Sequence, residues 1–177
     1  IHGDCRDAGS LGLKEKSIQC IITSPPYIME KVSYDHGTLA DTISGSEFGK
    51  NLADCFDQLL PFLKEDHTIW VNLGDYKREG SYLGAKHYFV IEMLKREYRC
   101  IDEVIWFKPN AKPDAHSRQT TCSHENIFVF TKSNNPLYHS PLDQEEKTLR
   151  FPLKLDLKTF SEESIWDLGG RIIMKKV

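Results

Sequence analysis

Two prolines interrupt an apolar run in the stretch Ile21-Ile22-Thr23-Ser24-Pro25-Pro26-Tyr27. The run begins at Ile18 and predicts a buried strand that ends where the prolines begin. Pro25 fixes its own φ and lacks an N–H, and the proline that follows each of Ser24 and Pro25 drives both toward extended geometry. We therefore expect a stiff loop at the carboxyl end of a strand, where open α/β sheets bind their ligands.

This loop carries groups that suit a planar base with an amino group. Ser24 brings a hydroxyl, Tyr27 brings an aromatic ring, and the proline carbonyls have no neighbouring proline N–H to pair with. A hydroxyl and a carbonyl held side by side can accept the two hydrogens of an amino group, while the ring stacks on the base. The alternative interpretation is a Pro-Pro turn that only ends the strand.

Length and composition indicate one globular domain of 177 residues, with 40% hydrophobic and 28% charged residues. A net charge of -3 does not favour a non-specific nucleic-acid binder but is compatible with a local basic cleft. The five cysteines are scattered without a C-x-x-C pair, so neither a metal site nor a disulfide framework is predicted. These scattered cysteines fit a reducing cytoplasm best, so we expect a cytoplasmic protein. No apolar run has the length of a membrane span and no signal peptide opens the chain, so no membrane partner is expected.

Apolar segments alternate with amphipathic ones along the chain. Three strand–helix–strand steps predict an α/β domain with a mainly parallel sheet, and the last strand pair is expected to be antiparallel, joined by a loop over 108–124. Besides residues 18–22, the predicted strands cover residues 68–73, 101–107 and 126–132.

Two helices are predicted from apolar residues that recur at helical spacing, one over 47–60 and the other over 84–98. Pro61 is expected to end the first. The second should turn four apolar side chains inward, namely those of Phe89, Val90, Met93 and Leu94.

The proline-rich loop resembles the Ser/Asp/Asn-Pro-Pro-Tyr motif of the DNA amino-methyltransferases, which methylate N4 of cytosine or N6 of adenine with S-adenosylmethionine. Members with the permuted, beta-type motif order carry further motifs that this sequence matches in the same order over about residues 1–132. The matching segments are Gly3-Asp4, Trp106-Phe107-Lys108-Pro109-Asn110 and His124-Glu125 with the strand that ends at Lys132; Ser164-Ile165-Trp166-Asp167 also resembles the segment that usually follows target recognition.

The resemblance implies a Rossmann-like methyltransferase sheet, S-adenosylmethionine as cofactor and double-stranded DNA as partner. Ser24, Pro25, Pro26 and Tyr27 would be catalytic, with Tyr27 stacked on a base flipped out of the duplex. Asp4 would sit beside the adenine of the cofactor, and Thr23 is a second cofactor-binding candidate. An equally good role for Asp4, compatible with the first, is to cap the short helix that follows, as Asp7 could also do.

Polar loops supply the candidate DNA contacts. In the expected recognition loop, four residues are candidates for phosphates or base edges: Lys108, Lys112, His116 and Arg118. An ordinary polar loop is the alternative. The polar segment 28–46 is either a lid over the flipped base or a surface loop. His124 and Glu125 could form an acid–base pair, but we interpret them as structural residues that shape the loop.

One departure from the family pattern concerns the cofactor. The glycine-rich loop that should follow the recognition region is not found, and Gly169-Gly170 fits a turn better. The sheet is therefore expected to be incomplete, and the chain, which begins at Ile1, to be a piece of a longer protein. The expected organisation is a catalytic region over 1–107, a recognition-type loop over 108–124, and a closing strand with a recognition or linker region over 125–177.

Ser24 in place of the aspartate that is commoner among adenine methylators favours N4-cytosine over N6-adenine. The rival function is a non-catalytic or split DNA-binding subunit, which the absent glycine loop favours and the intact proline motif disfavours. Amide methylation of a protein is disfavoured because Ser24 stands where those enzymes carry asparagine. The oligomeric state is left open, between a homodimer and a chain that lacks a C-terminal segment.

Overall fold

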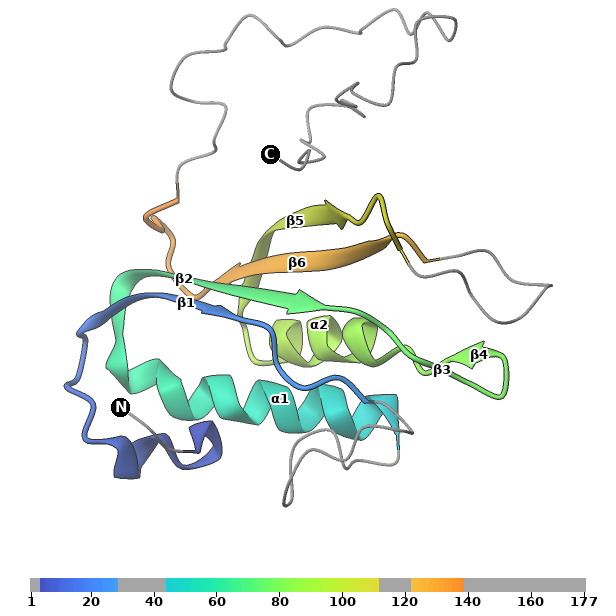
Figure 1. The fold of residues 1–177 in the computed structure, drawn as a ribbon. Helices are drawn as coiled ribbons and strands as arrows, with labels where there is room; N and C mark the ends of the chain where they lie inside the picture. The colour runs from blue at the N-terminus through green and yellow to red at the C-terminus, as the bar shows by residue number, and fades with distance from the viewer. Residues whose placement is uncertain (1–3, 29–43, 112–121, 139–177) are drawn as a thin grey trace, which may run out of the picture.

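A four-stranded sheet forms the centre of the computed structural model, which describes residues 4–28, 44–111 and 122–138 (Figure 1). The strand order is β1-β2-β6-β5. β1 is parallel to β2, whereas β6 is antiparallel to both β2 and β5. Three strands therefore run in one direction and one runs against them, which confirms the predicted fold class. The strands are β1 (Ile18–Thr23), β2 (Leu63–Leu73), β5 (Arg99–Phe107) and β6 (His124–Thr131).

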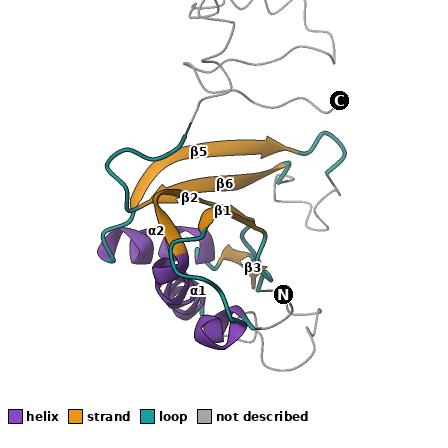
Figure 2. Ribbon diagram, turned by 90° about the vertical axis from the view of Figure 1, so that its left-hand side faces the viewer, coloured by secondary structure: helices purple, strands orange, loops and turns teal. Residues whose placement is uncertain are grey.

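Both long helices pack on the same face of this sheet (Figure 2). α1 spans Gly45–Leu59 and begins where the Ser44 hydroxyl accepts a hydrogen bond from the Glu47 backbone N–H. It ends before Pro61, as predicted, and the 3₁₀ turn η3 (Leu60–Phe62) leads into β2. α2 spans Ala85–Lys95 and follows Gly84, which has a positive φ of 70°. The 3₁₀ helix η1 (Cys5–Leu11) and a small hairpin of β3 (Lys77–Arg78) and β4 (Ser81–Tyr82) complete the described elements.

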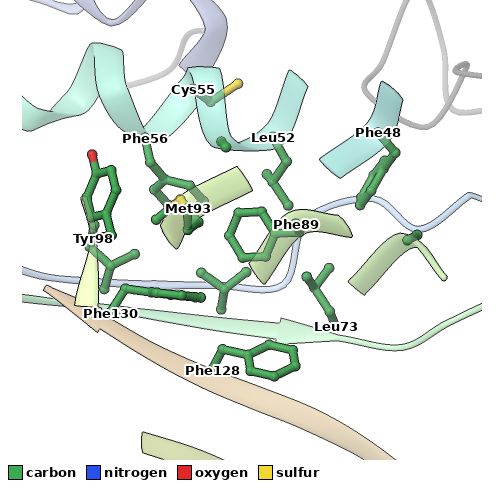
Figure 3. Close-up of a cluster of buried hydrophobic side chains, with 14 of the residues drawn as sticks. Phe48, Leu52, Cys55, Phe56, Leu73, Phe89, Met93, Tyr98, Phe128 and Phe130 are labelled. Carbon is green, nitrogen blue, oxygen red and sulfur yellow. The ribbon is translucent and has the colours of Figure 1, made fainter. Parts of the chain in front are cut away.

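The core lies between the helices and the sheet, and aromatic rings fill much of it (Figure 3). Phe89 of α2 is fully buried and meets Phe130 of β6 edge to face, with ring centroids 5.5 Å apart. Phe56 of α1 also contacts Phe89, with ring centroids 5.8 Å apart. Burying each such ring contributes roughly 2–3 kcal/mol. These contacts hold α1 and α2 together and against β6.

Close helix packing depends on Gly49 of α1. A Cβ atom at this position would lie 2.6 Å from the backbone N of Phe89 and 2.7 Å from the backbone C of Tyr88. The backbones of α1 and α2 therefore meet without an intervening side chain, which only glycine allows.

Two predictions of burial were wrong. Leu94 is 50% exposed, because the buried stripe of α2 follows Phe89 and Met93, and Leu94 is rotated about 100° beyond Met93. Ile22 in the strand that was expected to be buried is 80% exposed. Ile21 packs against the core, so its neighbour in the strand, Ile22, points to the opposite face of the sheet. Within the described residues, no helix has the length and apolar character that a membrane span requires.

Candidate active site

β1, β2 and β5 end, and β6 begins, on the same side of the sheet, at the edge that runs across the strand ends. Thr23, the last residue of β1, lies opposite Val71, so the proline-rich loop leaves beside the end of β2. β6 runs the other way, which places its first residues at the same edge; Asn126 pairs there with Leu73. The sheet topology thus gathers residues separated by about a hundred positions in the chain at the place where α/β sheets bind ligands.

Tyr27 turns inward from the loop and is half-buried. Its ring packs on Gly74, where an added Cβ would lie 3.2 Å from the ring carbon Cε2. Its hydroxyl lies 3.1 Å from Glu125 Oε2, to which it donates, and accepts a hydrogen bond of 3.0 Å from Asn72 Nδ2. Burial raises the pKa of Tyr27, and the neighbouring Glu125 carboxylate adds to this rise, so the phenol stays protonated at neutral pH.

Ser24 is the exposed member of the motif, while Pro25 is buried and Pro26 is half-buried. The Ser24 Oγ atom lies 3.3 Å from the Tyr27 hydroxyl oxygen. The stiff backbone of the two prolines and the inward Tyr27 therefore hold the serine hydroxyl at the surface of the site.

Glu125 joins the residues of this edge. Its Oε2 atom accepts from Asn72 Nδ2 at 2.7 Å as well as from Tyr27, and its Oε1 atom forms an ion pair with the Lys108 ammonium. Burial alone would raise the pKa of the Glu125 carboxyl, but the bonds from Lys108, Asn72 and Tyr27 outweigh it and hold this pKa below its usual value. The carboxylate is therefore ionised at neutral pH.

Asp4 lies at the start of η1 and is exposed. Its Oδ1 atom accepts from the Arg6 backbone N–H at 2.9 Å, so the predicted capping role is confirmed. The Arg6 side chain and backbone N–H both donate to the carboxylate and hold the pKa of Asp4 at about 2. The contact with a cofactor adenine stays a prediction, as does the role of Thr23.

Cys5, next to Asp4, has a thiol whose hydrogen bond with Cys55 of α1 lowers its pKa. We expect alkylation of Cys5 by iodoacetamide to follow a titration whose midpoint lies below the ordinary thiol pKa, because the thiolate is the nucleophile. In a Cys55→Ala variant the midpoint should rise toward the ordinary thiol value of about 8.5. Peptide mass spectrometry of the alkylated chain over a pH series measures both; an unchanged midpoint in the variant would exclude Cys55 as the cause.

Some of the predicted site residues lie together in the structure, whereas others lie outside the described residues. Lys108, predicted to contact DNA, lies in the site and pairs with Glu125. Lys112, His116 and Arg118 lie outside the described residues, as do positions 29–43 of the expected lid. Asn72 and Gly74 were missed, although a polar residue and a glycine at the end of a predicted strand are a usable signal. The interpretation of Glu125 as structural did not include its contact with Tyr27.

A family described as DNA methylase matches residues 18–167 of the chain. Among curated proteins, the type II methyltransferase M.MwoI of Methanothermobacter wolfeii is 28% identical over 146 residues, covering 80% of this chain and 21% of that protein. M.SmaI of Serratia marcescens, also a type II methyltransferase, is 26% identical over 198 residues, covering 96% of this chain and 66% of its own length. The chain thus spans less than two thirds of these relatives.

Solved structures show the same fold. The PvuII DNA methyltransferase, described as cytosine-N4-specific, superposes with a TM-score of 0.61 at 19% identity, covering 76% of this chain and 49% of its own. TTHA0409 from Thermus thermophilus, complexed with S-adenosyl-L-methionine, gives a TM-score of 0.52 at 20% identity, covering 78% of this chain and 55% of its own.

Proposed function

The chain belongs to the DNA methylase family of N4- and N6-directed enzymes, and from this membership we propose that its site presents the exocyclic amine of a DNA base for methylation. One observation carries the proposal. The Ser24-Pro25-Pro26-Tyr27 loop lies at the carboxyl end of β1, with its tyrosine hydroxyl fixed by Asn72 and Glu125 and its serine hydroxyl exposed.

Methylation of this amine requires a usable lone pair on the nitrogen. The target base must first leave the duplex stack, because its amine cannot be approached in line while it is paired. The lone pair is delocalised into the ring, and accepting the amine hydrogens through Ser24 and the Pro25 carbonyl favours a pyramidal nitrogen. Tyr27 provides a ring for stacking. The residues thus act mainly by positioning the nucleophile.

S-adenosylmethionine, when bound, supplies the methyl group. The described residues fit only one end of it: Asp4 offers an ionised, exposed carboxylate to its nucleoside. For the amino-acid end, the described residues hold no glycine cradle, because the one glycine at this edge, Gly74, is covered by the Tyr27 ring. We therefore assign no residue to that end and no step through it.

We propose N4 of cytosine as the methylated atom, with N6 of adenine as the alternative. Ser24 stands where adenine methylators more often carry aspartate, and the similarity to the cytosine-N4-specific PvuII enzyme supports the same choice. Double-stranded DNA is the proposed partner, with Lys112, His116 and Arg118 as candidate contacts to its phosphates or base edges.

A second candidate is a non-catalytic or split subunit that keeps the target-base side of the site. It is favoured by the described residues alone, which offer no glycine cradle for the amino-acid end of S-adenosylmethionine. In both cases the edge formed by the strand ends meets the base, but only the first predicts methyl transfer.

Mass spectrometry of nucleosides tests the proposal. The chain is incubated with duplex DNA and S-adenosylmethionine, and the DNA is digested. We expect N4-methylcytosine; N6-methyladenine would correct the choice of base. If no methylated nucleoside formed, even with the longest protein that the same gene encodes, the enzymatic function would be rejected in favour of the non-catalytic subunit.

A further inference from the structure

We propose that Lys108 and Glu125 are positioning residues that orient the hydroxyls of Tyr27 and Ser24, so that Ser24 presents its lone pairs to the target amine. The inference rests on the proposed function, since it assigns a task to residues that need not touch the substrate. It also replaces the DNA contact expected for Lys108 with a role inside the site.

The order of donors and acceptors gives the hydroxyls a direction. Glu125 is an acceptor only, because its carboxylate is ionised. The Tyr27 hydroxyl has two acceptors within reach, Glu125 Oε2 at 3.1 Å and the Asn72 carbonyl oxygen at 3.5 Å, and its hydrogen points to the nearer, charged one. Asn72 Nδ2 can only donate, and it donates to the Tyr27 oxygen at 3.0 Å. Two further donors meet the Tyr27 oxygen, the Gly74 backbone N–H and the Ser24 hydroxyl, whose Oγ atom lies 3.3 Å from it.

Ser24 completes this chain as a donor. With its hydrogen pointing to Glu125, Tyr27 can only accept from the Ser24 hydroxyl, which leaves both lone pairs of the exposed Ser24 oxygen without a partner among the described residues. An amino group needs acceptors, so this is the orientation that suits it. Bonds in such a chain polarise one another, and a charged end strengthens the effect.

Partial burial favours the ion pair between Lys108 and Glu125 over a contact of Lys108 with DNA. The Glu125 side chain is 17% exposed and that of Lys108 is 40% exposed, so their ion pair is partly shielded from water. Moving the ammonium to a DNA phosphate would leave a largely buried carboxylate short of a partner, which is costly. Lys108 follows β5 and Glu125 lies in β6, so the pair also ties the end of β5 to the start of β6 beside Tyr27.

A carboxyl ¹³C NMR titration of the folded protein tests the charge of Glu125, which ends the series of hydrogen bonds, and needs no activity assay. We expect the pKa of Glu125 to rise in Lys108→Met and, less, in Tyr27→Phe, because each substitution removes a donor to the carboxylate. The matched control is the exposed surface pair Lys16–Glu65, whose atoms lie 3.0 Å apart. Lys16→Met should leave the Glu125 titration unchanged. An unchanged titration in Lys108→Met would overturn the inference, whatever the chain catalyses.

A mutant cycle on methyl transfer tests the positioning itself, using the longest active product of the gene. Tyr27→Phe and Glu125→Gln should each lower kcat about tenfold with KM for DNA little changed, and the double variant should lose no more than Tyr27→Phe alone. Glu65→Gln is the control. If the losses of kcat in the two single variants multiplied in the double variant, Glu125 would not act through Tyr27. If the Lys108→Met variant only weakened DNA binding and reduced its salt dependence, Lys108 would be a phosphate contact and not a positioning residue.

Discussion

Replacing Gly49 by alanine is expected to lower the free energy of unfolding by about 3 kcal/mol. In an exposed helix the same substitution stabilises by roughly 1 kcal/mol, because alanine has the higher helix propensity. Here the added Cβ would lie 2.6 Å from the backbone N of Phe89 and 2.7 Å from the backbone C of Tyr88. Backbone atoms of α2 cannot move aside as the end of a long side chain can, so α1 and α2 must separate and the contacts of Phe89 with Phe56 and Phe130 weaken.

Urea denaturation followed by circular dichroism measures this loss. Gly9→Ala is the matched control, because a Cβ at Gly9 would have nothing within 4 Å, and its unfolding midpoint should stay close to that of the natural chain. A Gly49→Ala chain as stable as the natural one would mean that the two helices do not pack as closely as described.

Much of the fold could be predicted because each element carries its own signal. Helical spacing identified α1 to within two residues at its start, and Pro61 marked its end because proline cannot continue a helix. Apolar runs located all four strands of the sheet. The exposure of Ile22 could not be predicted, because an apolar run indicates a tendency to be buried and does not say which face of the strand packs on the core.

The site was harder to predict from the sequence, because its residues lie far apart along the chain. Ser24 to Tyr27 are adjacent and form a motif whose rigidity follows from the prolines. Glu125 lies ninety-eight positions from Tyr27, and only the antiparallel β6 brings the two together. A carboxylate in a strand has no local signal that names its partner. For the same reason the prediction that Lys108 contacts a phosphate or a base edge did not include its ion pair with Glu125.

Replacing Ser24 by alanine is expected to lower kcat for methyl transfer about 100-fold, with DNA affinity changed by less than about twofold. The substitution removes the exposed oxygen that accepts from the target amine and leaves Tyr27, Asn72 and Glu125 bonded to one another. Because Ser24 is exposed, the free energy of unfolding should not fall, and the loss reports chemistry. Single-turnover methyl transfer to duplex DNA, with binding measured separately, distinguishes the two effects.

A second substitution at the same position decides whether an acceptor is what Ser24 provides. Aspartate can accept from an amine but, when ionised, cannot donate to the Tyr27 oxygen, so Ser24→Asp should recover part of the activity that Ser24→Ala loses. Ser81→Ala, which removes another exposed hydroxyl on β4, controls for loss of a surface serine and should behave as the natural chain does. If Ser24→Ala methylated DNA at the natural rate, the amine hydrogens would have to be accepted elsewhere, and the proline carbonyls alone would carry the site.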